Sequence, residues 1–459
     1  MTTIVRPDRG EPARTLHVVD KAGLDGWRAA RPAAARALLD AAKFKGKPGQ
    51  VAPFPAGEEW QAAVGVGQAG ALDSWSLSAA AETLPAGTYR LADGAPGRAA
   101  LGWLLAGYRF GRYRKSDEAE GERVLLTSEP AGIDAFLAEA AATALVRDLV
   151  NTPAEDMGPA ELEDEAARVA RLHGAEVAVT RGDALQQGFP LIHAVGRAAA
   201  RGREPRLVEL EWGNPAHPRL AVVGKGVTFD TGGLDIKPAS GMRLMKKDMG
   251  GAAHALALAQ LVMGLALPVR LHLLLPLAEN AISGPALRPG DVIRARDGTS
   301  VEIHNTDAEG RLILADALVR AGEEKPALLF DFATLTGAAR VALGPDLPAL
   351  FSDDEELARG LEGAGREVDD PLWRMPLWGG YDDMLKSEVA DLANAHDGGM
   401  AGAITAALFL KRFAPSGVPW AHLDTFAWRP KAKPGRPAGG DALGLRATWA
   451  YLQARFGRG

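Results

Sequence analysis

Three charged side chains stand at alternate positions in NTDAEGRLILADAL, residues 305–318, directly before an apolar run. They are Asp307, Glu309 and Arg311. Alternate side chains of an extended segment project from the same face, so these three groups are expected to converge. The apolar residues that follow recur at helical spacing and predict a buried helix. The segment has two interpretations: two carboxylates and a guanidinium gathered at one site, or a charged loop facing water.

A second group of charged residues lies in VGKGVTFDTGGLDIKPASGMRLMKKDMGGAA, residues 223–253, where an apolar strand-like run ends. Its Gly-Lys pair is not a phosphate-binding loop, because the glycine five residues earlier and the Ser or Thr directly after the lysine are missing. The glycines also lack the spacing of a dinucleotide-binding motif. The charged residues that remain are Lys225, Asp230, Lys237, Lys246, Lys247 and Asp248.

The two segments together supply four carboxylates, which are enough for a pair of divalent cations: Asp230, Asp248, Asp307 and Glu309. Two metal ions held by carboxylates suit hydrolysis, because one ion activates water and both stabilise the developing oxyanion. The alternative for a lone Asp in a glycine-rich loop is a turn or cap residue. The chain has no cysteine, so a metal site must use carboxylate, imidazole, carbonyl or amine ligands.

The bulk composition is that of an ordinary globular protein, with 459 residues, 47% hydrophobic and 24% charged. The formal net charge of −6 provides no global basic field to attract nucleic acid or an anionic membrane. The N-terminal segment has no apolar stretch of the signal-peptide type. The longest apolar tract, residues 255–278, is interrupted by Pro268 and Arg270, so it predicts a buried helix followed by a buried strand. A cytoplasmic protein without a membrane segment is expected.

The order of apolar segments predicts an α/β fold with two domains. Residues 1–145 form the smaller N-terminal α/β domain, with strands in AAVGVG and RVLLTS, a helix over residues 98–114 and a long linking helix near the domain's end. Residues 146–459 form the larger catalytic domain. Its near-continuous apolar strands alternate with helices, which indicates a mostly parallel central sheet flanked by helices. Such sheets place their sites beyond the carboxyl ends of the strands, where the charged residues cluster.

These segments resemble the leucyl (cytosol) aminopeptidases, the M17 metallopeptidases. The opening segment is similar to the family's signature, and VGKGVTFDTGG, IKP and MKKDMGGAA are similar to its metal-binding block. The resemblance continues through RDLVNTPAEDMGPAEL, FDFATLTGAA, ADLANAHDGGMAGAITAALFL and WAHLD, and so covers nearly all of residues 145–450. The N-terminal region matches only loosely.

The resemblance implies two divalent metal ions per subunit, Zn²⁺ or Mn²⁺. Asp230 and Glu309 would bridge them, Asp307 would complete the more exchangeable site, and Lys225 and Asp248 would complete the tighter one. Lys225 must lose its proton to bind metal, so its pKa must fall well below about 10.4. Histidines 254 and 422 are interpreted as packed residues rather than ligands.

The resemblance also implies the reaction, in which a metal-bridging hydroxide attacks the first peptide bond of a substrate with a free N-terminus. Lys237 and Arg311 would be the catalytic pair. The Lys237 ammonium stabilises the tetrahedral oxyanion, and Arg311 would hold a bicarbonate that carries the proton. A homohexamer is the assembly implied.

The pocket for the first side chain of the substrate would be lined by Met245, Thr334, Leu335 and Gly337. The family usually continues Ile-Ala-Gly after HLD, whereas this chain has Thr425–Trp428, TFAW, so a leucine preference does not carry over. The basic, proline-rich residues 428–437 are interpreted as a solvated loop, and Lys246 and Lys247 as facing solvent or another subunit. The alternative functions are nucleic-acid binding through the N-terminal domain and a catalytically silent scaffold, although every expected site residue is present.

Overall fold

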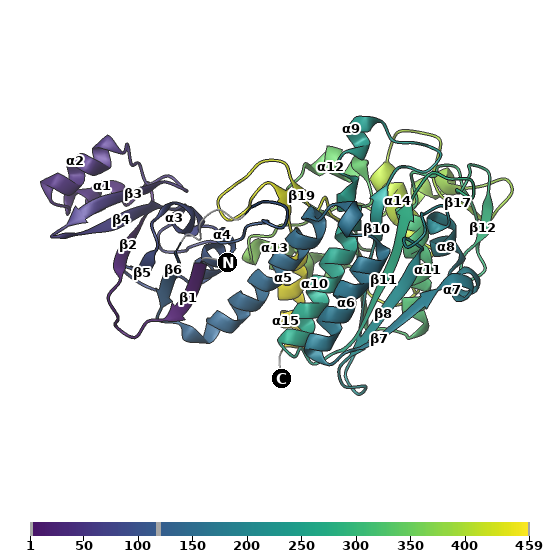
Figure 1. Cartoon of the computed structure of the whole chain (residues 1–459), viewed down its shortest axis with the longest axis horizontal. Coiled ribbons are helices and arrows are strands. Elements are labelled where there is room, and N and C mark those ends of the chain that lie inside the picture. Colours follow the sequence, from purple (N-terminus) through teal and green to yellow (C-terminus); the bar gives the residue numbers. More distant parts are fainter. Residues whose placement is uncertain (1–2, 116–120, 458–459) are drawn as a thin grey trace. The chain divides into compact units, whose positions relative to one another are not determined.

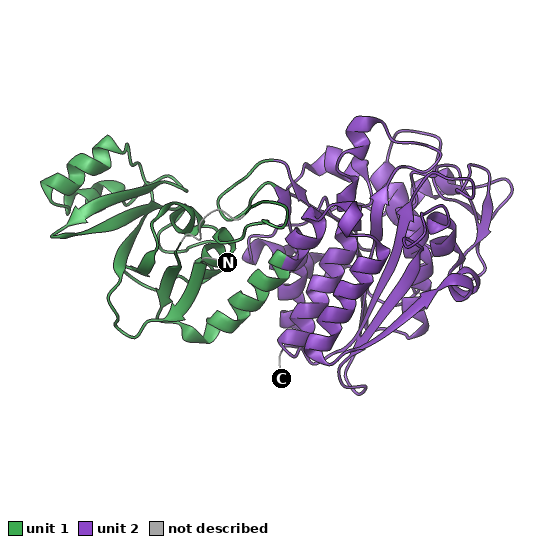
Figure 2. Cartoon of the chain, viewed as in Figure 1, with its two compact units in different colours: residues 1–144, 431–438 green, residues 145–430, 439–459 purple. Residues whose placement is uncertain are grey.

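The computed structural model describes residues 3–115 and 121–457, and the chain divides into two compact units (Figure 2). Unit 1 comprises residues 1–144 and 431–438, and unit 2 comprises residues 145–430 and 439–459. The division falls inside α5 (Ile133–Asn151), the long helix that precedes Pro153. One continuous helix therefore contributes residues to both units.

Unit 1 contains a six-stranded sheet in the order β1-β6-β5-β2-β4-β3 (Figure 1). All its neighbouring strands pair in parallel except β3 and β4. The strands are β1 (Thr3–Pro7), β2 (Arg14–Val19), β3 (Val51–Ala56), β4 (Glu59–Gly65), β5 (Gly87–Leu91) and β6 (Arg123–Thr127). The helices are α1 (Leu24–Ala29), α2 (Ala33–Ala41), α3 (Ser78–Thr83) and α4 (Ala99–Ala106), with a short 3₁₀ turn η1 (Pro130–Gly132) before α5.

The helix predicted over residues 98–114 is much shorter in the structure, which is a correction. It ends at Ala106, and the aromatic residues after it are in irregular backbone. A Cβ at Gly107 would lie 2.1 Å from the Thr3 side-chain oxygen, so the chain passes very close to β1 at this point. That close approach is a tertiary contact that periodicity does not report.

Unit 2 is built on a nine-stranded sheet in the order β16-β15-β18-β14-β9-β11-β8-β7, with β10 paired to β11. Strands β18, β14, β9 and β11 pair in parallel and form its centre, whereas β15, β8 and β7 join antiparallel neighbours. The strands are β7 (Glu176–Arg181), β8 (Arg206–Trp212), β9 (Arg219–Gly224), β10 (Gly226–Asp230), β11 (Arg270–Asn280), β14 (Leu328–Ala333), β15 (Ala349–Phe351), β16 (Trp373–Arg374) and β18 (Trp420–Asp424). A three-stranded sheet contains β12 (Val292–Arg294), β13 (Ser300–Glu302) and β17 (Leu392–Ala393). A two-stranded sheet contains β19 (Trp428–Arg429) and β20 (Gly439–Gly440).

Helices cover both faces of this sheet, with α10 and α6 on one face and α11 and α8 on the other (Figure 1). The helices are α6 (Pro159–His173), α7 (Gly182–Gly188), α8 (Pro190–Gly196), α9 (Ala239–Met242), α10 (Gly250–Gly264), α11 (Gly310–Glu323), α12 (Gly337–Leu343), α13 (Glu355–Glu367), α14 (Gly402–Lys411) and α15 (Leu445–Phe456). The 3₁₀ segments are η2 (Ala154–Asp156), η3 (Met245–Met249) and η4 (Gly379–Leu385). The predicted α/β fold, with a smaller N-terminal and a larger C-terminal part, is confirmed.

The central strands end in register, and this alignment positions the site. Phe332 of β14 pairs with Gly224 of β9, and Ala333 pairs with Asp424 of β18. Every residue of β9, β14 and β18 is buried, because helices cover the sheet on both sides. The segments beyond these ends therefore meet at one edge. The apolar tract of residues 255–278 is the helix and strand expected, and no helix among the described residues could span a bilayer.

Candidate metal centre

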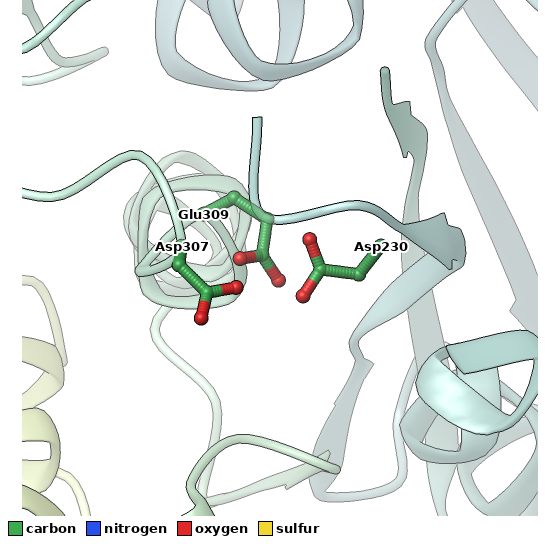
Figure 3. A group of neighbouring side chains, drawn as sticks. All are labelled: Asp230, Asp307 and Glu309. Atoms are coloured by element: carbon green, nitrogen blue, oxygen red, sulfur yellow. The ribbon is translucent and has the colours of Figure 1, made fainter. Parts of the chain in front are cut away.

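Three carboxylates converge beyond the sheet edge, as Figure 3 shows. Asp230 ends β10, Glu309 directly precedes α11, and Asp307 lies in the turn before it. Each contributes an oxygen, and these oxygens all lie within 4.8 Å of one another. Asp230 and Glu309 are buried, whereas 32% of the Asp307 side chain is exposed. Such an all-oxygen cluster is the donor set that hard and borderline divalent cations prefer.

The backbone around Asp230 is held in a tight turn that fixes its carboxylate. Asn280 Nδ2 donates to Asp230 Oδ1 at 2.8 Å, and the Gly232 N–H donates to the same oxygen at 2.9 Å. Gly232 and Gly233 have φ of +86° and +68°, a region that residues with a side chain rarely adopt. The glycines are therefore required for the turn. The sequence pattern did not predict the strand β10 that leads into this turn.

Asp248 and two lysines complete the group. Lys225 Nζ lies 2.6 Å from Asp248 Oδ2 and 3.0 Å from Glu309 Oε1, and its side chain is only 2% exposed. Lys237 Nζ lies 2.7 Å from Asp230 Oδ2 and also pairs with Asp307. The structure thus brings together all four predicted carboxylates and both predicted lysines.

The electrostatics of the centre reflect an excess of carboxylates over cations. Burial, followed by the neighbouring Asp230 charge, raises the pKa of Glu309 to about 8 and the pKa of Asp307 to about 6. Burial disfavours the charged form of Lys225, but Asp248 and Glu309 outweigh it and raise its pKa above the ordinary value. The protein atoms alone therefore favour a Lys225 ammonium. Bound cations would relieve the repulsion among the carboxylates and favour a neutral lysine.

Arg311 lies in the first turn of α11, beside the carboxylates. Its Nη1 donates to the Asn394 carbonyl at 2.7 Å, and within the described part of the chain its buried Nε has no hydrogen-bond acceptor. Burial lowers the pKa of Arg311 to about 10, so the guanidinium stays charged at neutral pH. A cavity of about 220 Å³ is lined by Arg311 together with Asp307 and Gly337, and it leaves room for a small anion or substrate group.

The predicted side-chain pocket residues lie next to this centre. Thr334 follows β14, and its Oγ1 donates to Asp248 Oδ1 at 2.9 Å. Leu335 and Gly337 line the same cavity as Arg311. Met245 begins η3, the segment that carries Asp248, and is 9% exposed.

Asp424 was not predicted to take part in the site, yet it fixes the loop that carries these pocket residues. Its Oδ1 accepts the N–H groups of Leu335 and Thr336 at 2.9 and 3.2 Å, and its Oδ2 accepts the Thr336 hydroxyl at 2.6 Å. The signal available in the sequence was an aspartate at the end of the apolar run WAHLD, because sites of α/β folds form beyond strand ends.

Several expectations need correction. Residues 305–309 are irregular, with a turn at residues 306–307, and do not form a strand; Glu309 has helical φ and ψ of −73° and −34°. The charged groups converge because a turn leads into a helix, not because of strand alternation. Lys247 does not face solvent, since only 6% of its side chain is exposed. Arg429, within the segment expected to be solvated, is buried in β19 and paired with Asp441 and Asp346.

The two histidines are packed inside the fold, as expected. His254 Nδ1 lies 2.7 Å from the Gly250 carbonyl, and its Nε2 accepts the Leu443 N–H at 3.0 Å. His422 Nδ1 lies 2.5 Å from Asp331 Oδ1 in the sheet. Both imidazole rings are therefore held by hydrogen bonds within the fold, and neither contacts the carboxylate cluster through these bonds.

Comparison with known proteins places the chain in a family. Residues 144–448 match the model of the cytosol aminopeptidase family, catalytic domain. The chain belongs to this family. Residues 15–126 match the M17 aminopeptidase N-terminal domain. The chain is therefore an aminopeptidase of the M17 type, a metallo-exopeptidase and hydrolase.

Relatives with curated names support the same assignment. The chain is 42% identical over 369 residues to a probable cytosol aminopeptidase of Syntrophotalea carbinolica, covering 77% of this chain and 73% of the relative. It is 43% identical over 389 residues to one of Rhodococcus jostii, covering 79% and 76%. The crystal structure of the cytosol aminopeptidase from Coxiella burnetii has a TM-score of 0.92 at 43% identity and covers 99% of both chains. The bottromycin maturation enzyme BotP in complex with Mn has a TM-score of 0.87 at 36% identity, covering 97% of this chain and 100% of BotP.

Proposed function

We propose that this aminopeptidase binds two divalent metal ions at the carboxylate cluster and removes the first residue of peptides with a free N-terminus. The observation that carries the proposal is the convergence of Asp230, Asp307 and Glu309, with oxygens within 4.8 Å of one another. Asp248 adjoins them through Lys225. The donor set fits Mn²⁺ or Zn²⁺, since both bind carboxylate oxygen and amine nitrogen.

The ligands divide between the two ions in the proposal. Asp230 and Glu309 would contribute to holding both ions, Lys225 and Asp248 would help to hold the tighter one, and Asp307 the more exchangeable one. The greater exposure of Asp307 supports this division, because solvent reaches its carboxylate while the other position is enclosed. A relative solved in complex with Mn supports the choice of metal class.

When bound, the ions would polarise the peptide carbonyl and lower the pKa of water at the centre. The substrate's free α-amine would occupy a ligand position, which restricts cleavage to the first bond. Lys237, held by Asp230 and Asp307, would donate its N–H to the oxygen that gains negative charge. Arg311, anchored by Asn394, would hold a bicarbonate in the adjacent cavity, where this anion would supply a general base.

Chelation tests the metal requirement. We expect dialysis against EDTA to abolish hydrolysis of a peptide with a free N-terminus, and Mn²⁺ or Zn²⁺ to restore it. Elemental analysis of the restored protein should give two ions per subunit. Full activity in protein shown to be metal-free would refute the proposal.

We also propose a homohexamer and a cytoplasmic location, both supported by the resemblance to cytosol aminopeptidases. Nucleic-acid binding is not favoured, because the net charge of −6 provides no general attraction for phosphates.

A further inference from the structure

The loop Thr425–Trp428 places an aromatic ring, Phe426, beside two cations. Lys247 Nζ lies 5.3 Å from the centre of the Phe426 ring, and the Arg340 guanidinium carbon lies 5.0 Å from it. Cations at these distances are attracted to the ring face. Phe426 is half-buried, Lys247 is buried and Arg340 is exposed, so the three side chains run from the interior to the surface.

These cations flank the region assigned to the first side chain of the substrate. Lys247 Nζ lies 3.7 Å from Asp248 Oδ1, on the side of the metal centre. Arg340 Nη2 lies 3.9 Å from the position that a Cβ on Gly337 would take. Gly337 in turn lines the cavity that Asp307 and Arg311 border. Arg340 therefore lies beside a residue that lines this cavity, and Lys247 lies beside a carboxylate of the metal centre.

Acidic groups only partly offset the positive charge at this loop, where the Asp424 carboxylate acts on Lys247 and lines the same small cavity as Arg340. Among the described residues, Arg340 has no carboxylate within ion-pair distance, and the single acidic contact of Lys247 is Asp248, which Lys225 holds more closely. Lys246, the next cation, donates to the Asn151 carbonyl and lies over Trp428 at 5.6 Å. The buried Arg147 and Arg429 differ in this respect, because both pair with Asp441.

We propose that the pocket for the first side chain selects an acidic residue, Glu or Asp, whose carboxylate pairs with Arg340 and Lys247. The inference rests on the proposed exopeptidase function and names its substrate class. An apolar side chain would leave these cations without a partner and would compete with Phe426 for space. A carboxylate gains two cationic donors in a partly desolvated site, where charge complementarity separates substrates.

The test compares substrates that differ only in the first side chain. Mn²⁺-loaded enzyme is assayed on the 4-nitroanilides of Glu, Gln, Asp, Asn, Leu and Ala. We expect kcat/KM for Glu to exceed that for its isostere Gln by about tenfold or more, because the Gln carboxamide lacks the negative charge that pairs with the two cations. The Glu-to-Gln ratio should fall as salt rises, since the discrimination is electrostatic.

Substitutions of Arg340 test whether this residue causes the preference for Glu over Gln. Arg340→Gln should reduce the Glu-to-Gln ratio about tenfold, and Arg340→Lys should recover part of it. Arg359→Gln on α13 is the matched control, because its side chain is 79% exposed in that helix, and it should leave the ratio unchanged. Product inhibition provides a second measurement, in which free L-glutamate should inhibit wild type more strongly than L-glutamine and lose this advantage in Arg340→Gln.

The outcomes separate the two levels of the proposal. Hydrolysis of the Leu or Gln anilide with kcat/KM equal to or above that of Glu would refute the acidic preference and leave the aminopeptidase function intact. An unchanged ratio in Arg340→Gln, with thermal unfolding like that of wild type, would also refute it. If metal-loaded enzyme cleaves none of the substrates, the proposed function itself fails.

Discussion

Lys225 and Lys237 stand twelve residues apart and are assigned opposite duties, so replacing each by methionine tests the mechanism. Lys225→Met leaves Asp248 and Glu309, which are 3% and 2% exposed, without their shared cation. Removing one partner of a buried ion pair costs about 3–5 kcal/mol, so we expect that loss in the free energy of unfolding without metal. Lys237→Met should cost only about 1 kcal/mol, because Asp307 is open to solvent and Asp230 keeps other donors.

The two variants should differ again when metal is supplied. Lys225→Met should hold less metal at a given free concentration, because a ligand is missing. Lys237→Met should keep both ions and lose about 10²–10³-fold in kcat, the usual effect of removing one oxyanion donor. Lys411→Met on α14 is the control, since its side chain is 42% exposed and pairs with Asp353 at the surface.

The measurements are urea unfolding followed by tryptophan fluorescence in EDTA, elemental analysis after metal loading, and steady-state kinetics. A Lys237→Met protein that loses its metal, beside a Lys225→Met protein that keeps metal and normal turnover, would refute the assigned roles.

Three further outcomes are expected. An N-acetylated peptide should not be cleaved, because its blocked nitrogen cannot bind metal; comparable rates for free and acetylated peptides would indicate an endopeptidase. Burial lowers the pKa of His422, but the adjacent Asp331 outweighs it and raises the pKa above 6.5. The stabilisation from protonated His422 is therefore complete below pH 6.5 and is lost as pH rises through the higher pKa of the folded state. In urea titrations between pH 6 and 9, His422→Gln should make the free energy of unfolding depend less on pH. Light scattering should report a hexamer, and a monomer at micromolar concentration would contradict the proposed assembly.

Local patterns in the sequence predicted most of the fold that surrounds the site. The continuous apolar runs of β9 and β14 indicated strands covered on both faces, and helical spacing indicated α10 and α11. Charged residues directly after these segments indicated where a site would form, since strand ends of an α/β sheet share one edge. These signals are local, and the elements they describe form by local periodicity and burial.

The same local reasoning failed where neighbouring segments decide the structure. The strand β10 was not predicted, because its strand character depends on pairing with β11. The helix predicted over residues 98–114 is longer than α4, because the close approach of Gly107 to Thr3 involves residues about a hundred positions apart. A pattern within one segment contains no information about such a neighbour.

The sequence by itself therefore determined the chemical groups available to this aminopeptidase, four carboxylates, two lysines and an arginine, and the edge of the sheet at which they meet. Only the tertiary structure decided how their surroundings act on them. Asp424 reaches the pocket loop through hydrogen bonds that span 88 and 89 residues, and Lys247 is buried against Phe426 from a distant loop. Charge environment and burial depend on which segments pack together, and that packing follows from the whole sheet rather than from any one stretch of chain.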